Sequence, residues 1–182
     1  MKSEKSAAGT LMQILLLGRD RARALLRRHR VVERHLTDVL GFDLPRAHAE
    51  ADRLEHQVSA DTVQTLAAQL GDPETCPHGN PIPDARTQVA RSPLTALTDC
   101  APSTRATISR IALETPAALQ HLATLGLLPN VEVEVENIAP FGGPVLVRVG
   151  RAHYALGRDL AVRIWIKERL ESGDSDHPIS NL

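Results

Sequence analysis

The chain has 182 residues, of which 42% are hydrophobic and 24% charged, as is typical of a soluble globular protein with one large domain or two small ones. Aromatic residues make up only 2%, so any core must be built from leucine, valine, isoleucine and alanine. The formal net charge of -1 gives no electrostatic argument for a nucleic-acid partner.

Cysteine use and hydropathy bear on the compartment. Cys76 and Cys100 form no CxxC motif, which argues against a disulfide framework and predicts a reducing, cytoplasmic setting. The apolar run LMQILLLG at residues 11–18 lacks a small-residue cleavage site and leads straight into arginines, so we do not interpret it as a signal peptide. No stretch approaches the roughly 18 apolar residues of a membrane span, and no membrane partner is predicted.

A first helix is predicted from Arg19 to Leu40. Residues 1–18 begin polar, become apolar and end at Gly18, which is expected to break the chain before the helix. Gly41 follows the helix as its expected C′ residue. The apolar positions with helical spacing are Leu25, Leu26, Val32, Leu36, Val39 and Leu40. Arginines crowd the first half of this helix at positions 19, 21, 23, 27, 28 and 30, and their simplest interpretation is a solvated helix face.

Two shorter helices are predicted next. Asp43 is the expected N-cap of a helix over residues 44–57, and Ser59 or Asp61 is the expected N-cap of a third helix that runs through Leu70. Three helices of this size are too few to enclose a roomy core. Much of their apolar surface is therefore expected to pack against a second copy of the chain, which predicts a homodimer.

The second helix carries the segment HAEADRLEH at residues 48–56. Successive residues of an α-helix are about 100° apart, so positions i, i+4, i+7 and i+8 share one face. The residues at these positions are His48, Asp52, Glu55 and His56. Two imidazoles and two carboxylates on one helix face are unusual unless a cation lies between them.

His29 and Glu33 form a second pair of donors, one turn apart on the first helix. If the two helices pack antiparallel, up to six nitrogen and oxygen ligands converge. The sequence therefore predicts a transition-metal site, or two such sites, shared between these helices. A lone histidine on an apolar stripe is more often a core residue, but Glu33 and the second cluster favour a ligand role for His29.

Residues 72–93 are rich in proline, glycine and polar residues, which is typical of a linker or a docked loop. Cys76 and His78 lie two positions apart in this segment, a spacing that suits zinc. No second Cys/His pair completes a set of four ligands, so a structural role is the preferred interpretation of the pair.

From Leu94 to Lys167 the hydrophobic period changes to that of strands. Val131, Val133 and Val135 alternate with glutamates, PFGGP at residues 140–144 marks a turn, and a short helical segment separates two of the strands. The fold class predicted is α+β, with a helical domain followed by a small, mostly antiparallel barrel of about five strands. The expected boundaries are 1–18 for an N-terminal remnant, 19–83 for the helical domain, 84–93 for a linker, 94–167 for the barrel and 168–182 for a disordered tail.

With these segments in place, the chain resembles the diphtheria toxin repressor family of iron- and manganese-dependent transcriptional regulators. The stretch RRHRVVERHLTDVLGFDLPRAHAEADRLEH and the later CPHGNPIP resemble the family's metal-binding and dimerisation domain. The segment from LTDCAPSTRATISRIA to HYALGRDLA resembles its SH3-like domain and the ferrous iron transport protein A fold. The resemblance covers roughly residues 17–167.

The resemblance implies two adjacent metal sites. It assigns His29, Glu33 and His48 to the ancillary site and Asp52, Glu55 and His56 to the primary, activating site. Glu114 is the nearest carboxylate for the ligand that the SH3-like domain lends in some members. Iron-responsive members carry a cysteine at the position of Asp52, whereas manganese-responsive members carry a carboxylate. An oxygen donor favours harder cations, so the expected cofactor is Mn²⁺ or Fe²⁺, with Zn²⁺ or Co²⁺ expected to bind in vitro.

The N-terminus departs from the family pattern. Members begin with a winged helix-turn-helix that reads operator DNA and supplies a further ligand to the primary site, whereas only residues 1–18 precede the first helix here. Operator DNA is therefore an expected partner only if a winged-helix domain lies upstream or in a heterodimer partner. A wrongly chosen start codon and a genuine truncation are both open interpretations.

Two classes of function follow. The first is a metal-dependent regulator of metal homeostasis, acting as a metal-sensing homodimer, with a metal-buffering or ferrous-iron-transport accessory protein as the alternative. The second is a metalloenzyme, for which the HExxH motif and the paired Glu-x-x-His motifs of di-iron bundles are absent. No enzyme activity is predicted.

Overall fold

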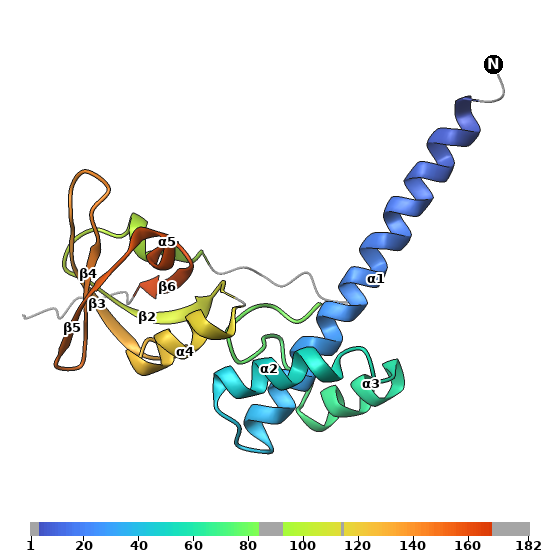
Figure 1. The fold of residues 1–182 in the computed structure, drawn as a ribbon, viewed down its shortest axis with the longest axis horizontal. Coiled ribbons are helices and arrows are strands. Elements are labelled where there is room, and N and C mark those ends of the chain that lie inside the picture. The colour runs from blue at the N-terminus through green and yellow to red at the C-terminus, as the bar shows by residue number, and fades with distance from the viewer. Residues whose placement is uncertain (1–3, 84–92, 114, 169–182) are drawn as a thin grey trace, which may run out of the picture. The chain divides into compact units, whose positions relative to one another are not determined.

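The computed structural model describes residues 4–83, 93–113 and 115–168, with side chains described from Leu17 onward. These residues form two compact units (Figure 1). The helical unit contains the described residues up to 83 together with residues 110–129, and the sheet unit contains residues 93–109 and 130–168. No helix among the described residues is both long and apolar enough to cross a membrane.

The helical unit contains α1 (Glu4–Asp38), α2 (Leu44–Leu54), α3 (Ala60–Gln69) and α4 (Pro116–Thr124). Asp43 caps α2 as predicted and accepts the Arg46 N–H at 2.9 Å. Of the two candidates for α3, Ser59 is the cap and accepts the Thr62 N–H at 3.1 Å, whereas Asp61 lies in the first turn. Figure 1 shows α2 and α3 beside the C-terminal half of α1.

Two helix boundaries differ from the sequence prediction. Gly18 does not break the chain, because α1 continues through it. A glycine inside a helix costs only about 1 kcal/mol relative to alanine, which the flanking leucine, arginine and alanine residues offset. Helix α2 ends at Leu54 rather than near Gln57. The Leu54 carbonyl accepts both the Gln57 and Val58 N–H groups, so the last turn tightens and the chain reverses toward the Ser59 cap.

The core of the helical unit lies on both sides of α1. Val32 and Leu36 pack with Ala47 and Ala51 of α2. On its other side, α1 packs against α3 and the loop over residues 74–83. The buried residues of this second cluster are Val31, Val63, Ala67, Cys76 and Ile82. This packing fixes the face of α1 that carries His29 and Glu33 against α2.

The sheet unit is built on a six-stranded sheet of order β1-β6-β2-β3-β4-β5. The strands are β1 (Thr95–Ala96), β2 (Thr104–Ile111), β3 (Glu132–Ile138), β4 (Val145–Val149), β5 (Ala152–Leu156) and β6 (Ile164–Glu168). The β1–β6, β2–β3, β3–β4 and β4–β5 pairs are antiparallel. Two short helices, η1 (Leu97–Asp99) and α5 (Arg158–Ala161), complete the unit. The predicted α+β fold class is confirmed, with one strand more than predicted.

Candidate metal centre

The predicted donors of α1 and α2 converge because the two helices pack antiparallel. His29 faces Glu55, whereas Glu33, one turn further along α1, faces His48. The cap at Asp43 starts α2 at the point that turns His48 and Asp52 toward α1. The antiparallel packing on which the prediction depended is therefore present.

A first group of donors surrounds His29. Its Nδ1 lies 3.0 Å from Glu55 Oε2 and 3.2 Å from Asp52 Oδ1, and its Nε2 lies 3.1 Å from His48 Nδ1. Burial alone would lower the pKa of His29, but the hydrogen bond and negative charge of Glu33 outweigh burial and raise this pKa above its ordinary value. A hollow of about 320 Å³ opens beside this group. It is lined by Ala22, Leu25, Leu26, His29, His48, Asp52 and Glu55.

A second group of donors surrounds Glu33, whose side chain is only 1% exposed. Its Oε1 lies 2.8 Å from His48 Nδ1 and 3.0 Å from His78 Nδ1, while His29 Nε2 is 3.7 Å away. Burial alone would raise the pKa of Glu33, but the imidazoles of His29, His48 and His78 outweigh burial and hold this pKa well below its ordinary range. Glu33 is therefore an anion at neutral pH, buried among three rings.

Cys76 lies at the edge of the second group. Its sulfur is 3.9 Å from His78 Nδ1, and its side chain is buried. Burial, reinforced by the negative charge of Glu33, raises the pKa of Cys76 to about 12. The thiol is therefore protonated at neutral pH. The donor group of Glu33, His48 and His78 is complete without Cys76.

These donors fit a divalent transition-metal ion. The groups His29/His48/Asp52 and Glu33/His48/His78 each place one donor atom per residue within 4.8 Å of one another. Among the described residues, Glu33 Oε2 and His78 Nε2 are buried and have no hydrogen-bond partner. Imidazole nitrogen and carboxylate oxygen suit manganese, iron and zinc.

The structure groups the predicted ligands differently from the sequence. His48 belongs to both groups, and His29 contacts the carboxylates of Asp52 and Glu55 as well as Glu33. The side chain of His56 is 67% exposed and contacts Glu55 at 3.3 Å, outside both groups. The early end of α2 explains this, because His56 no longer lies on the helix face from which its direction was inferred. Glu114 lies outside the described residues.

His78 is the candidate metal ligand that sequence reasoning missed. It comes from the loop over residues 74–83 and is 3% exposed at its side chain, directly against Glu33. The expected solvated arginine face is also wrong in part, because Arg27 donates to the Pro83 carbonyl at 3.0 Å and Arg30 donates to the Pro81 carbonyl. These arginines hold the loop against α1. The CPHGNPIP segment was the available signal. Of the two interpretations of residues 72–93, a linker or a docked loop, the described residues 74–83 agree with the docked loop.

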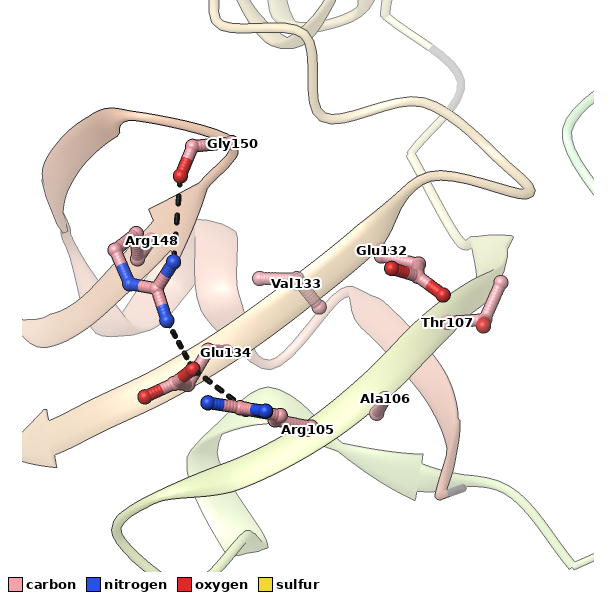
Figure 2. A pocket seen from close by; sticks show the side chains of 8 residues that line it. All are labelled: Arg105, Ala106, Thr107, Glu132, Val133, Glu134, Arg148 and Gly150. Atoms are coloured by element: carbon pink, nitrogen blue, oxygen red, sulfur yellow. Dashed lines mark hydrogen bonds and ion pairs between the residues drawn. The ribbon is translucent and has the colours of Figure 1, made fainter.

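A separate hollow of about 300 Å³ lies on the outer face of β2, β3 and β4 (Figure 2). Figure 2 shows Arg105 and Arg148 directed at the same carboxylate, that of Glu134, with Thr107 and Glu132 side by side at the other end. Arg148 also donates to the Gly150 carbonyl at 3.3 Å. The cationic groups of this hollow are thus engaged by a carboxylate and do not converge on an open anion site.

Two family models match the chain. Residues 17–84 match the model described as iron dependent repressor, metal binding and dimerisation domain, and residues 95–168 match the FeoA domain. The two matches cover the helical segments with the loop, and then the strands with α4.

Individual proteins give the same picture. The chain is 31% identical over 176 residues to the iron-dependent repressor IdeR of Mycobacterium leprae, covering 86% of this chain and 73% of that protein. It is 34% identical over 163 residues to IdeR of Mycobacterium tuberculosis, covering 83% and 70%. A solved structure described as a manganese-dependent transcriptional repressor in complex with manganese superposes with a TM-score of 0.73 at 35% identity, covering 84% of this chain and 73% of that one.

Proposed function

Because this chain belongs to the iron-dependent repressor family, we propose that it is a metal-sensing homodimer that regulates metal homeostasis through the α1–α2 centre. The observation that carries the proposal is the buried Glu33 carboxylate, which three imidazoles contact from α1, α2 and the loop. A lone buried carboxylate is costly, and this arrangement suits a site that exchanges protons for a cation.

Manganese or iron is the proposed ion. His29, His48, Asp52 and Glu55 offer only nitrogen and oxygen, and donors of this kind suit Mn²⁺ and Fe²⁺. Zn²⁺ and Co²⁺ are expected to bind in vitro, because affinity follows ligand type rather than cellular supply. A bound cation would supply the positive charge that balances the carboxylates of Glu33, Asp52 and Glu55. His56 and Glu114, implied as ligands by the family resemblance, stay secondary candidates.

A homodimer is the proposed assembly. The family model that matches residues 17–84 is named for dimerisation. Val39 and Leu40 are 58% and 55% exposed where α1 ends, which leaves apolar surface available for a second copy. Operator DNA is a proposed target only if a winged-helix domain is present upstream in the same protein or in a heterodimer partner. The two cysteines are buried and free, which supports a reducing, cytoplasmic setting.

The test is anaerobic calorimetry with Mn²⁺ and Fe²⁺ on the wild type and three variants. His48→Ala is expected to weaken binding at both groups, because His48 belongs to each, whereas Asp52→Ala is expected to weaken only the first. Glu50→Gln is the matched control, because it removes a carboxylate from the same helix that belongs to neither donor group. Glu50 Oε2 instead pairs with Arg53 Nη1 at a distance of 3.5 Å. Equal binding by wild type and His48→Ala would contradict the proposal.

A metal-buffering or ferrous-iron-transport accessory protein is the second candidate, favoured by the FeoA match over residues 95–168. The two candidates differ in their response to DNA. The protein for this test includes any coding sequence that lies upstream of the present chain. In a gel-shift assay, a regulator is expected to slow a promoter fragment of a metal-uptake gene only when Mn²⁺ or Fe²⁺ is present. Metal binding without any such retardation would favour the second candidate. Catalysis is not proposed.

A further inference from the structure

The loop over residues 74–83 is folded back on itself, with His78 near its tip. The Cys76 N–H donates to the Asn80 carbonyl at 2.9 Å, and the Gly79 N–H donates to the Cys76 carbonyl at 2.9 Å. The Ile82 N–H donates to the Glu74 carbonyl at 2.7 Å. Gly79 has a φ of +78°, a conformation that glycine adopts without steric cost. His78 is therefore presented by a closed turn with few internal degrees of freedom.

The backbone of one residue, Ile111, then fixes this turn from outside. The Ile111 N–H, at the end of β2, donates to the His78 carbonyl at 2.9 Å. The Asn80 side-chain Nδ2 donates to the Ile111 carbonyl at 3.0 Å. Ile111 is 0% exposed and Asn80 is 8% exposed, so water cannot readily replace either hydrogen bond if one partner is removed. The two bonds form a clamp on either side of Gly79.

The opposite end of the loop is held by α1. Arg27 donates to the Pro83 carbonyl at 3.0 Å, and Arg30 donates to the Pro81 carbonyl. Proline has no backbone N–H, so the carbonyl is the only backbone group through which Pro81 and Pro83 can bond to α1. With both ends fixed, the direction of the His78 ring depends on the backbone between Asn80 and Cys76.

We propose that Asn80 is a positioning residue of the metal centre, which acts by locking the backbone of His78 so that its ring faces Glu33. The inference rests on the proposed role of His78 and Glu33 in metal binding. The Asn80 side chain donates to the Ile111 carbonyl, so its effect on His78 passes through the backbone of Ile111, whose N–H donates to the His78 carbonyl. Outer groups that orient a metal ligand commonly change metal affinity by about 10–100-fold when removed.

The test is a double-mutant cycle in metal affinity, with Mn²⁺ and Zn²⁺ alone as probes in anaerobic calorimetry. Asn80→Ala is expected to weaken binding at the Glu33/His48/His78 group by about tenfold or more. In a His78→Ala background the same substitution is expected to change affinity less than twofold, because no ring is left to position. Binding at the His29/His48/Asp52 group is expected to stay within twofold of the wild type.

A spectroscopic readout separates positioning from general loss of stability. In the metal-free protein His78 Nδ1 lies 3.0 Å from Glu33 Oε1, and the NMR signal of the proton between these two atoms is expected to broaden or shift upfield in Asn80→Ala. Thr65→Val is the matched control, because it removes another side-chain donor to a backbone carbonyl, at 3.0 Å in α3. Asn80→Asp removes the donor at nearly constant volume and replaces the alanine variant if that variant fails to fold.

The outcomes are distinct. If Asn80→Ala weakens binding equally with and without His78, or leaves wild-type affinity unchanged, Asn80 is not a positioning residue. If His78→Ala and Glu33→Gln both bind metal like the wild type, the proposed function of this group fails, and the inference fails with it. A weakened His78→Ala with an unaffected Asn80→Ala would overturn the inference alone.

Discussion

Glu33→Gln is the substitution that tests the buried charge of the centre most directly. The wild-type carboxylate is 1% exposed and receives His48 Nδ1 at 2.8 Å and His78 Nδ1 at 3.0 Å. The surrounding imidazoles hold the pKa of Glu33 well below its ordinary range, so their attraction exceeds the cost of burying the charge. Glutamine keeps the shape of the side chain and one acceptor but removes the charge.

The magnitude follows from the two short bonds. A hydrogen bond to a charged group contributes about 1.5–3 kcal/mol, and the amide retains a weaker version of one of them. We therefore expect the metal-free variant to lose about 2–4 kcal/mol of unfolding free energy at pH 7. A loss of this size is a large part of the total stability of a small domain, which is commonly about 5–15 kcal/mol.

The assay is urea unfolding in excess chelator, followed by far-ultraviolet circular dichroism, with the slope against urea used to check two-state behaviour. Glu50→Gln serves as the control, since its exposed pair with Arg53 at 3.5 Å is expected to contribute less than about 1 kcal/mol. A Glu33→Gln variant at least as stable as the wild type would refute the reasoning. It would mean that desolvation outweighs the three imidazoles in the metal-free chain.

Three further predictions concern other parts of the molecule. Burial raises the pKa of Cys100 from 9.0 to about 11, so the unfolded chain loses this proton at lower pH than the folded protein. The free energy of unfolding, followed by thermal unfolding, should be unaffected below pH 9 and fall between pH 9 and about 11, by up to about 1.4 kcal/mol per pH unit. A Cys100→Ala variant with the same alkaline loss would contradict this. Gly143→Ala should cost about 1–3 kcal/mol in urea unfolding, because an added Cβ would lie 2.7 Å from a neighbouring side chain, while Gly157→Ala, with nothing described within 4 Å, should cost less than about 0.5 kcal/mol; equal effects would refute the packing argument. The double substitution Val39→Glu/Leu40→Glu should shift the proposed dimer toward monomer in analytical ultracentrifugation without changing metal affinity, and an unchanged dimer would place the interface elsewhere.

Much of the centre could be predicted from the sequence because its spacing is local. The pairs His29/Glu33 and His48/Asp52 are one helical turn apart, and caps such as Asp43 show where a helix starts. Each of these signals depends on only a few neighbouring residues. A short connection between two helices favours antiparallel packing, and this packing is what brings the two pairs of donors together.

The remaining features depend on contacts distant in sequence or on the exact end of a helix. His78 meets Glu33 across 45 positions in the chain, and the two-residue spacing of Cys76 and His78 contains no information about that contact. His56 was placed on the shared helix face by extending α2, and the tightened turn at Leu54 removes that helical argument, so its assignment now depends on the family resemblance alone. Gly18 was given too much weight as a helix breaker, since its small cost is offset by its neighbours.

The length of α1 has a mechanical consequence. His29 and Glu33 are rigidly joined to every preceding turn of the same helix, which begins at Glu4, so the 25 residues before His29 form an arm of about 38 Å at 1.5 Å per residue. A change of about 10° in the angle of α1 at the donor groups would move the far end of that arm by about 6–7 Å. If a rearrangement of the Glu33 carboxylate and its imidazoles tilted α1 by this angle, the far end of the helix would move by more than the pitch of one helical turn, about 5.4 Å.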